Sequence, residues 1–134
     1  MKTVKIAGIA LLMLLNTYTY AGVGPKQFCF EDSMVTDEQF AESNVITVEG
    51  VEKPALVQIR GIGEYSINGK NMGRKSAIVK NGDQIQVRHK SFDIDGAKVS
   101  TILMIGDTYD IFTTVTSKGG KPEASYRIDG PHCQ

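Results

Sequence analysis

The two cysteines are the residues with the most direct chemistry. Cys29 lies near the start of the chain and Cys133 stands next to the last residue. Their separation differs from the C-x-x-C spacing of redox-active pairs, and in an oxidising compartment two thiols most simply form one structural disulfide. We therefore predict a Cys29–Cys133 disulfide, with an intermolecular bridge or a free thiol as the alternatives.

The histidines give no indication of catalysis. His89 and His132 have no nucleophile, carboxylate or second ligand at a spacing typical of catalytic or metal sites. His89 falls on a predicted strand with polar outward residues, and we expect its side chain to be exposed. No catalytic residue is predicted, and the sequence favours a protein that is not an enzyme.

One acidic segment resembles the start of a calcium loop. Asp93-x-Asp95-Gly96 places carboxylates at alternate positions before a glycine, which suits a hard cation. The glutamate that completes an EF-hand is missing, since Thr101 occupies that region. A plain β-turn explains the segment better, and a calcium site using Asp93 and Asp95 with Asp107 or Asp110 is the alternative. No metal or cofactor is predicted.

A glycine pair resembles the start of a nucleotide-binding fingerprint. Gly61-Ile62-Gly63 lacks the third glycine, because Ser66 stands there, and no helical pattern follows. A dinucleotide site is therefore excluded, and we expect these glycines to serve the fold.

Charge is distributed unevenly along the chain. Residues 22–59 carry a net charge of −5, residues 60–90 carry +5 and residues 91–134 carry −2. The basic block suits an acidic glycan, lipopolysaccharide or the acidic face of a protein partner if its side chains converge; scattered solvated cations are the alternative. Nucleic acid is not expected, because only Tyr65 offers an aromatic ring within the block. The candidate binding residues are Lys70, Arg74, Lys75, Lys80, Arg88 and Lys90.

The composition is that of one globular domain. The chain has 134 residues, 41% hydrophobic and 22% charged, with 15 basic and 15 acidic side chains. Disordered and low-complexity classes are excluded by this balance.

The N-terminal residues predict export. Lys2 and Lys5 precede an apolar run over residues 6–15, which is shorter than the roughly 20 residues that span a bilayer. We predict that residues 1–21 are a signal peptide cleaved after Ala21, with no membrane span, and that the product is secreted or periplasmic. The mature chain would carry a net charge of −2.

The rest of the chain predicts an all-β fold. Short apolar alternations are separated by turn signals such as Asn68-Gly69 and Asn81-Gly82, a cadence typical of an antiparallel sandwich of seven or eight strands. In residues 84–90, Ile85 and Val87 face one side, while Gln84, Gln86 and Arg88 face the other. The predicted strands cover residues 45–48, 55–59, 65–67, 77–79, 85–90, 99–105, 109–115 and 124–128.

One helix is predicted. Residues 36–43 offer Thr36 as an N-cap, with Gln39 as its capping-box partner and Val35 and Phe40 as a hydrophobic staple. An irregular crossing loop is the alternative.

Several segments together resemble a known family. They look like the immunoglobulin-like β-sandwich repeat module of exported and surface proteins of proteobacteria, over residues 28–116. The matching pieces are Phe28-x-Phe30-x-Asp32, Ser43-Asn44-x-Ile46-Thr47-Val48-x-Gly50, Pro54-Ala55-x-Val57-x-Ile59, Glu64-Tyr65-Ser66-Ile67-Asn68-Gly69, Val79-x-Asn81-Gly82-Asp83-x-Ile85-x-Val87-Arg88, Thr101-x-Leu103-x-Ile105-Gly106-Asp107 and Asp110-x-Phe112-x-Thr114-x-Thr116.

The resemblance implies a non-catalytic immunoglobulin-like β-sandwich, which we assign to residues 22–116. The extension over 117–134, which the predicted disulfide ties back, departs from the family pattern. We therefore expect protein–protein or cell-surface recognition or assembly, through a protein partner or self-association. The alternatives are a subunit of an extracellular filament or of a secretion or pilus apparatus, and a periplasmic ligand-binding or inhibitor module. Tyr109 and Tyr126 are the aromatic anchors available to such a module.

Overall fold

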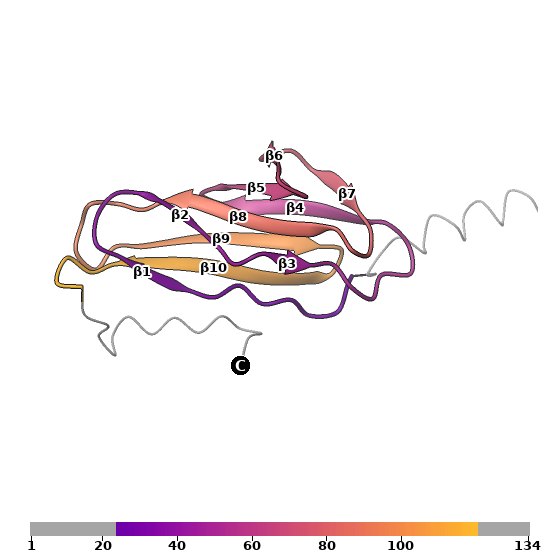
Figure 1. Cartoon of the computed structure of the whole chain (residues 1–134), viewed down its shortest axis with the longest axis horizontal. Coiled ribbons are helices and arrows are strands. Elements are labelled where there is room, and N and C mark those ends of the chain that lie inside the picture. Colours follow the sequence, from indigo (N-terminus) through magenta and orange to yellow (C-terminus); the bar gives the residue numbers. More distant parts are fainter. Residues whose placement is uncertain (1–23, 121–134) are drawn as a thin grey trace, which may run out of the picture.

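The computed structural model describes residues 24–120, which form two β-sheets (Figure 1). One sheet has the strand order β1-β10-β9-β4-β7, and the other has the order β2-β8-β5-β6, with β3 also pairing with β8. The strands are β1 (Ser33–Val35), β2 (Phe40–Glu42), β3 (Ile46–Thr47), β4 (Ala55–Gly61), β5 (Glu64–Ile67), β6 (Lys70–Gly73), β7 (Ala77–Val79), β8 (Gln84–Lys90), β9 (Lys98–Ile105) and β10 (Thr108–Thr116).

The core lies between the two sheets. Alternate residues of each strand point inward and bury their apolar side chains, because successive side chains of a strand point to opposite faces. Val57 and Leu103 of one sheet and Ile85 and Val87 of the other are all 0% exposed. The fold is therefore all-β, with the layered arrangement of a β-sandwich.

The alternation predicted for residues 84–90 is confirmed. In β8, Ile85 and Val87 are buried, whereas Gln84 is exposed and Gln86 and Arg88 are partly exposed. β9 carries apolar residues on both sides and is a central strand, since it lies between β10 and β4.

The predicted hairpin turn between β5 and β6 also forms. Asn68 and Gly69 both have positive φ, at 51° and 81°, as a type I′ turn requires. This turn sets β6 against β5 and fixes which side of the hairpin faces solvent.

The chain crosses from one sheet to the other at Gly61-Ile62-Gly63. Gly63 has a φ of 125°, and a Cβ placed there would lie 2.7 Å from the Arg88 carbonyl oxygen. Only glycine permits so close an approach of β5 to β8. The glycines therefore serve the fold, and they bring Glu64 into register with Arg88.

The predicted helix over residues 36–43 is wrong. Between β1 and β2 the chain makes a bend, and residues 40–42 form a strand that pairs with β8. Phe40 and Glu42 are exposed and Ala41 is buried, which is the period of two expected of a strand. Val35 lies in the core instead of forming a staple with Phe40, and pairing with β8 overrides the weak local helix signal.

The sheets are also not wholly antiparallel, and the described residues hold more strands than the seven or eight predicted. β1 pairs with β10 in parallel, with Ser33 opposite Thr114 and Val35 opposite Thr116. Alternation does not predict β1, β2 or β6, because each strand has only three or four residues, too few for the pattern to stand out.

Three predictions fall outside the described residues. These are the signal peptide at 1–21 with its cleavage after Ala21, the strand at 124–128, and the Cys133 end of the disulfide. Within residues 24–120, we find no helix long and apolar enough to cross a membrane.

Candidate functional site

The outward side of the second sheet carries polar side chains and one aromatic ring, and we call this surface the polar face. It draws on β2, β8, β5 and β6, and part of it encloses a hollow of about 200 Å³. Its members share the outward parity of their strands and are Phe40, Glu42, Glu64, Ser66, Asn71, Gln86 and Arg88.

The middle of the polar face is a row of alternating charge. Strand register places Arg88 opposite Glu42 on one side and opposite Glu64 on the other. The Arg88 guanidinium forms an ion pair with Glu64, donating a hydrogen bond from Nε to its carboxylate. Both side chains stay partly exposed, at 42% and 28%, so this row remains accessible from solvent.

An aromatic ring lies beside that row, because β2 places Phe40 opposite Lys90 in the neighbouring row. Phe40 is 62% exposed, and the Arg88 guanidinium carbon lies 5.0 Å from its ring centroid. This distance is typical of a cation–π contact. The contact holds an apolar ring on the surface, where most of it remains exposed.

A second row supplies uncharged hydrogen-bonding groups. Ser66 lies opposite Gln86 on one side and Asn71 on the other. Gln86 Nε2 donates to the Ser43 carbonyl oxygen at 2.7 Å, and Asn71 Oδ1 accepts from the Gly73 amide at 2.7 Å. These bonds fix the two amides, while Asn71 is exposed and Gln86 and Ser66 are partly exposed.

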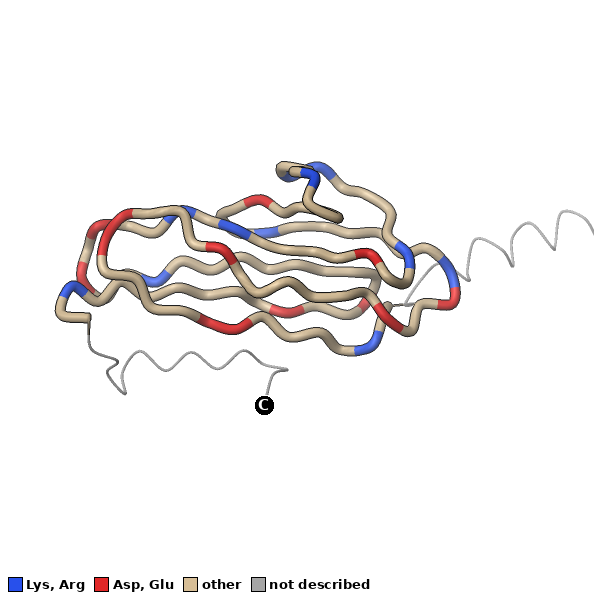
Figure 2. The backbone as a smooth tube through the Cα atoms, viewed as in Figure 1, with Lys and Arg blue, Asp and Glu red and all other residues tan. Residues whose placement is uncertain are grey.

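The six basic residues predicted as a binding patch do not all converge. Lys70, Arg74 and Lys75 gather around β6 at the edge of the sheet (Figure 2). Arg74 Nη1 donates to the Gly63 carbonyl oxygen at 2.6 Å, so part of this group holds the β6–β7 connection in place.

The other three basic residues have carboxylate partners. Arg88 pairs with Glu64 on the polar face, and Lys90 Nζ lies 2.5 Å from the Glu38 carboxylate. Lys80 belongs to a network around Asp83 between β7 and β8. Local neutralisation of these cations reduces the attraction that an acidic ligand would feel.

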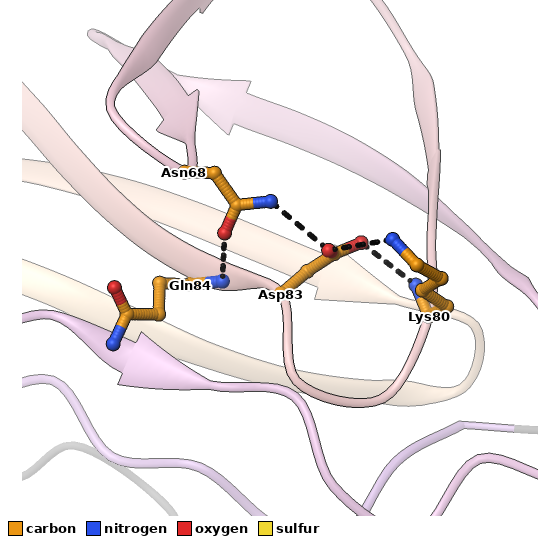
Figure 3. A network of polar contacts seen from close by, with 4 residues as sticks. All are labelled: Asn68, Lys80, Asp83 and Gln84. Atoms are coloured by element: carbon orange, nitrogen blue, oxygen red, sulfur yellow. Dashed lines mark hydrogen bonds and ion pairs between the residues drawn. The ribbon is translucent and has the colours of Figure 1, made fainter.

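The Asp83 network joins two turns (Figure 3). One carboxylate oxygen of Asp83 accepts from the Lys80 backbone amide at 2.9 Å, and the other accepts from Asn68 Nδ2 at 3.0 Å and from Lys80 Nζ at 3.1 Å. Asn68 Oδ1 accepts from the Gln84 amide at 2.9 Å. The hydrogen bond from the Lys80 backbone, followed by that from Asn68, lowers the pKa of Asp83 below its usual value.

The expectation that His89 is exposed is wrong. Its side chain is 1% exposed and stacks on Phe112, with ring centroids 4.7 Å apart. Nδ1 lies 2.7 Å from the Thr101 hydroxyl and Nε2 lies 2.8 Å from the Thr114 hydroxyl. Burial lowers the pKa of His89 to about 4, so the ring is neutral at pH 7 and acts as a polar part of the core.

The acidic segment considered for calcium is anchored by a lysine. Lys118 Nζ lies 2.7 Å from Asp93 Oδ1, and the Lys118 amide donates to Asp95 Oδ1 at 2.9 Å. Over the described part of the chain, no group of three or more His, Cys, Asp or Glu side chains is placed to hold a metal ion. The two carboxylates therefore fix the chain after β10.

Sequence reasoning found part of the polar face and missed the rest. The alternation of β8 already placed Gln86 and Arg88 outward, whereas Phe40 was assigned to a helix. Glu42 and Glu64 join Arg88 only through strand pairing. The one available signal was that Glu42 and Glu64 are acidic while β8 is basic. This signal predicts a site only when the pairing of the strands is known.

Comparison with known protein families, with curated proteins and with solved structures gives no match. The resemblance to an immunoglobulin-like module therefore rests on the residues quoted above.

Proposed function

We propose that this protein is an exported, non-catalytic β-sandwich of the immunoglobulin-like kind that recognises glycans at a cell surface. The polar face is the binding surface, and a hydroxyl-rich oligosaccharide is the ligand. The single observation that carries this proposal is the ordered array of Phe40, Arg88 and Glu64 beside the amide row.

The array matches the chemistry of sugars. A sugar hydroxyl both donates and accepts hydrogen bonds, and the polar face offers carboxylate acceptors, guanidinium donors and amides that do both. Adjacent strands lie about 4.8 Å apart, and outward residues along one strand repeat at about 7 Å, so these groups form a fixed grid. Phe40 adds an exposed ring against which the C–H side of a sugar can pack.

The charges favour a neutral or basic glycan over an acidic one. Two carboxylates, from Glu42 and Glu64, flank the single guanidinium of Arg88 in the middle row. The cations around β6 lie at the rim, and we expect them to influence the rate of encounter more than the strength of binding.

Support for a non-catalytic role comes from the state of the titratable groups. His89 is buried, neutral and bonded at both nitrogens, and Arg88 and Glu64 neutralise each other. These groups hold fixed positions, which suits recognition better than proton transfer.

The test is binding of the mature, oxidised protein to immobilised neutral, acidic and amino-sugar oligosaccharides. Phe40→Ser is compared with Ile78→Ser, because Ile78 is 61% exposed on the opposite side of the molecule against 62% for Phe40. We expect Phe40→Ser to weaken binding at least tenfold and Ile78→Ser to leave it unchanged.

Other outcomes would overturn parts of the proposal. Equal losses in the two variants would exclude the polar face as the site. Selective binding of acidic glycans that is lost in Lys70→Glu would move the site to the cations around β6. If no oligosaccharide binds and a protein from the cell envelope binds instead, through Phe40, the glycan is wrong and the partner is a protein.

One observation favours self-assembly as a second candidate. Leu56 and Ile78 form a cross-strand pair on the outside of β4 and β7, and they are 43% and 61% exposed. An apolar pair at a sheet edge suits contact between copies. Light scattering across a wide concentration range tests it: Ile78→Asp should abolish any oligomer, and a monomer at all concentrations in the unmodified protein would exclude this candidate.

A further inference from the structure

Large hydrophobic side chains are exposed together at one end of the sandwich, which we call the hydrophobic tip. Its members are Phe40, Ile62, Phe92 and Ile94, which are between 47% and 64% exposed. Figure 1 shows the β1–β2 and β8–β9 connections side by side at this end of the long axis. Single exposed hydrophobic residues are ordinary, whereas a group of them marks an interaction surface.

Backbone pairing brings the two aromatic rings of the tip together. β2 places Phe40 opposite Lys90, and the ladder continues by one residue, since the Ser91 amide donates to the Gln39 carbonyl oxygen at 2.9 Å. Ser91 is buried, so Phe92 returns to the outward side on which Lys90 lies. Phe92 is therefore a diagonal neighbour of Phe40, and the two rings flank Lys90.

Ile62 joins the tip from the crossing between β4 and β5. It comes two residues before Glu64, which lies opposite Arg88. This position sets Ile62 near the level of Lys90, on the side of β8 away from Phe40.

The loop that carries Phe92 and Ile94 is held in place by the fold. The Phe92 carbonyl oxygen accepts from the Thr116 hydroxyl at 2.7 Å, and the Ala97 amide donates to the Ile94 carbonyl oxygen at 3.0 Å. The carboxylates that alternate with these two residues contact Lys118. The hydrophobic side chains are thus presented by an ordered loop, which reduces the entropy lost on binding.

The tip continues the polar face along β8. Outward residues at 86, 88, 90 and 92 follow one another at about 7 Å and cover about 20 Å in all. The Gln86 row offers uncharged hydrogen-bonding groups, the Arg88 row is charged, and the hydrophobic side chains lie around Lys90 and beyond it. A surface that changes in this order fits a ligand with a hydroxyl-rich part and a hydrophobic part.

Residue types and charge favour a lipid surface over a protein groove at the tip. None of its four members is Trp, Tyr or Arg, the residues that dominate protein interfaces. Two nearby carboxylates are paired, Glu38 with Lys90 and Asp93 with Lys118, which lowers the cost of bringing them toward a medium of low dielectric constant. Asp37, exposed on the β1–β2 connection, favours a zwitterionic surface over an anionic one.

We propose that the hydrophobic tip docks on a lipid surface, and that the glycan held on the polar face is the headgroup of a glycolipid. The acyl chains lie on the side of Phe92 and Ile94, and the sugar units extend along β8 toward Gln86. The identity of the headgroup rests on the proposed glycan function, whereas the contact between the tip and lipid does not depend on it.

The first test measures contact with lipid directly. The chain has no tryptophan, so Phe92→Trp introduces a single fluorescent reporter at the tip. Ile78→Trp places the same reporter at a position of β7 that is 61% exposed and far from the tip in the sheet. The mature variants are titrated with phosphatidylcholine vesicles whose acyl chains carry bromine. We expect a blue shift and quenching in Phe92→Trp and no change in Ile78→Trp, because only the tip enters the lipid.

Two results would overturn docking on lipid. The first is no quenching in Phe92→Trp, or equal quenching in both variants. The second is an emission shift of Phe92→Trp that soluble envelope proteins cause and vesicles do not, which would identify a protein partner instead.

The second test separates the lipid contact from the sugar contact. Phe92→Ser and the control Ile78→Ser are tested with the immobilised oligosaccharide that binds most tightly, now free in solution or coupled to phosphatidylethanolamine in phosphatidylcholine vesicles. We expect Phe92→Ser to weaken vesicle binding at least tenfold and to leave binding of the free oligosaccharide unchanged, and Ile78→Ser to change neither.

The outcomes distinguish this inference from the glycan proposal. Equal losses of Phe92→Ser for the free and the lipid-linked oligosaccharide would assign Phe92 to the sugar site and overturn the inference while the glycan proposal stands. If no oligosaccharide binds but Phe92→Trp is quenched, the glycan proposal and the glycolipid headgroup are wrong, and docking of the tip on lipid is supported.

Discussion

The two outer surfaces of this protein are built by the same alternation and have opposite chemistry. On the polar face, β8 and β5 present charged and amide side chains to water, with one exposed ring at Phe40. On the outward side of the first sheet, which we call the apolar face, β9 and β10 present Ile102, Met104 and Ile111. A sheet needs only one apolar side to form a sandwich, so the apolar residues on the outward side of the first sheet are not required for the packing of the two sheets.

The two surfaces are also expected to differ in what they contribute to stability and to binding. Side chains on the polar face are partly exposed and paired with one another, and such pairs contribute little to folding. At the β10 end of the apolar face, side chains are buried as deeply as the core. We expect substitutions on the first surface to change binding and those on the second to change stability.

The largest effect is expected from a charge placed at a buried position on β10. Val115→Asp would bury a carboxylate at a position that is 2% exposed, and it should lower the free energy of unfolding by about 4 kcal/mol. Ile78→Asp, on the same face but 61% exposed, should change it by less than about 0.5 kcal/mol. Urea denaturation measures both free energies of unfolding. Similar losses in the two variants would show that Val115 and Ile78 do not differ in burial.

Acid should destabilise the interior between the two faces. The pKa of His89 is about 4 in the fold against an ordinary 6.5, so between these values the unfolded chain binds a proton that the folded chain does not. Stability is therefore fully present above pH 6.5 and falls as the pH drops toward 4, by about 3 kcal/mol in total.

Chemical denaturation at several pH values tests this expectation. His89→Gln should remove most of the loss between pH 6.5 and 4, and His132→Gln should retain it. A loss that persists unchanged in His89→Gln would assign the acid sensitivity to other groups.

A smaller effect is expected at Asp83, which joins the β5–β6 turn to the β7–β8 turn. Asp83→Ala removes the acceptor for the Lys80 amide and for Asn68, and it should cost about 2 kcal/mol. Because hydrogen bonds lower the pKa of Asp83, its contribution is present above the ordinary carboxyl pKa and is lost as the pH falls through the folded value. Glu52→Ala, at an exposed position, is the matched control in thermal denaturation.

The smallest effect concerns the charged row itself. A double-mutant cycle with Glu64→Gln and Arg88→Gln should give a coupling energy below about 1 kcal/mol for stability, since both partners are partly exposed. Glycan binding should nevertheless fall in each single variant. A coupling energy of several kcal/mol would mean that the row serves the fold, and it would weaken the contrast between the two faces.

Local alternation predicted much of this architecture. It identified β8 and β9, the outward positions of Gln86 and Arg88, and the turn at Asn68. The position of His89 was also available from the sequence, because it shares the parity of Ile85 and Val87 on β8. The polar side chain of His89 suggested exposure, whereas its position in the alternation of β8 correctly indicates burial.

Features that depend on pairing between distant segments could not be predicted. The row of Glu42, Arg88 and Glu64 exists because β8 lies between β2 and β5, and no local pattern specifies that order. The parallel contact of β1 with β10 is of the same kind. The helix predicted around Phe40 failed because three residues gain more from pairing with β8 than from an isolated turn of helix.

The parallel contact between the first and last strands has a mechanical consequence. β1 and β10 run in the same direction, so a force that pulls the two ends of the described chain apart drags these strands past each other along their length. Their hydrogen bonds, together with that between the Phe30 amide and the Asp110 carboxylate, are then loaded in shear and must break nearly at once. A sandwich tethered between two surfaces would thus resist extension through the pairing of its first strand with its last.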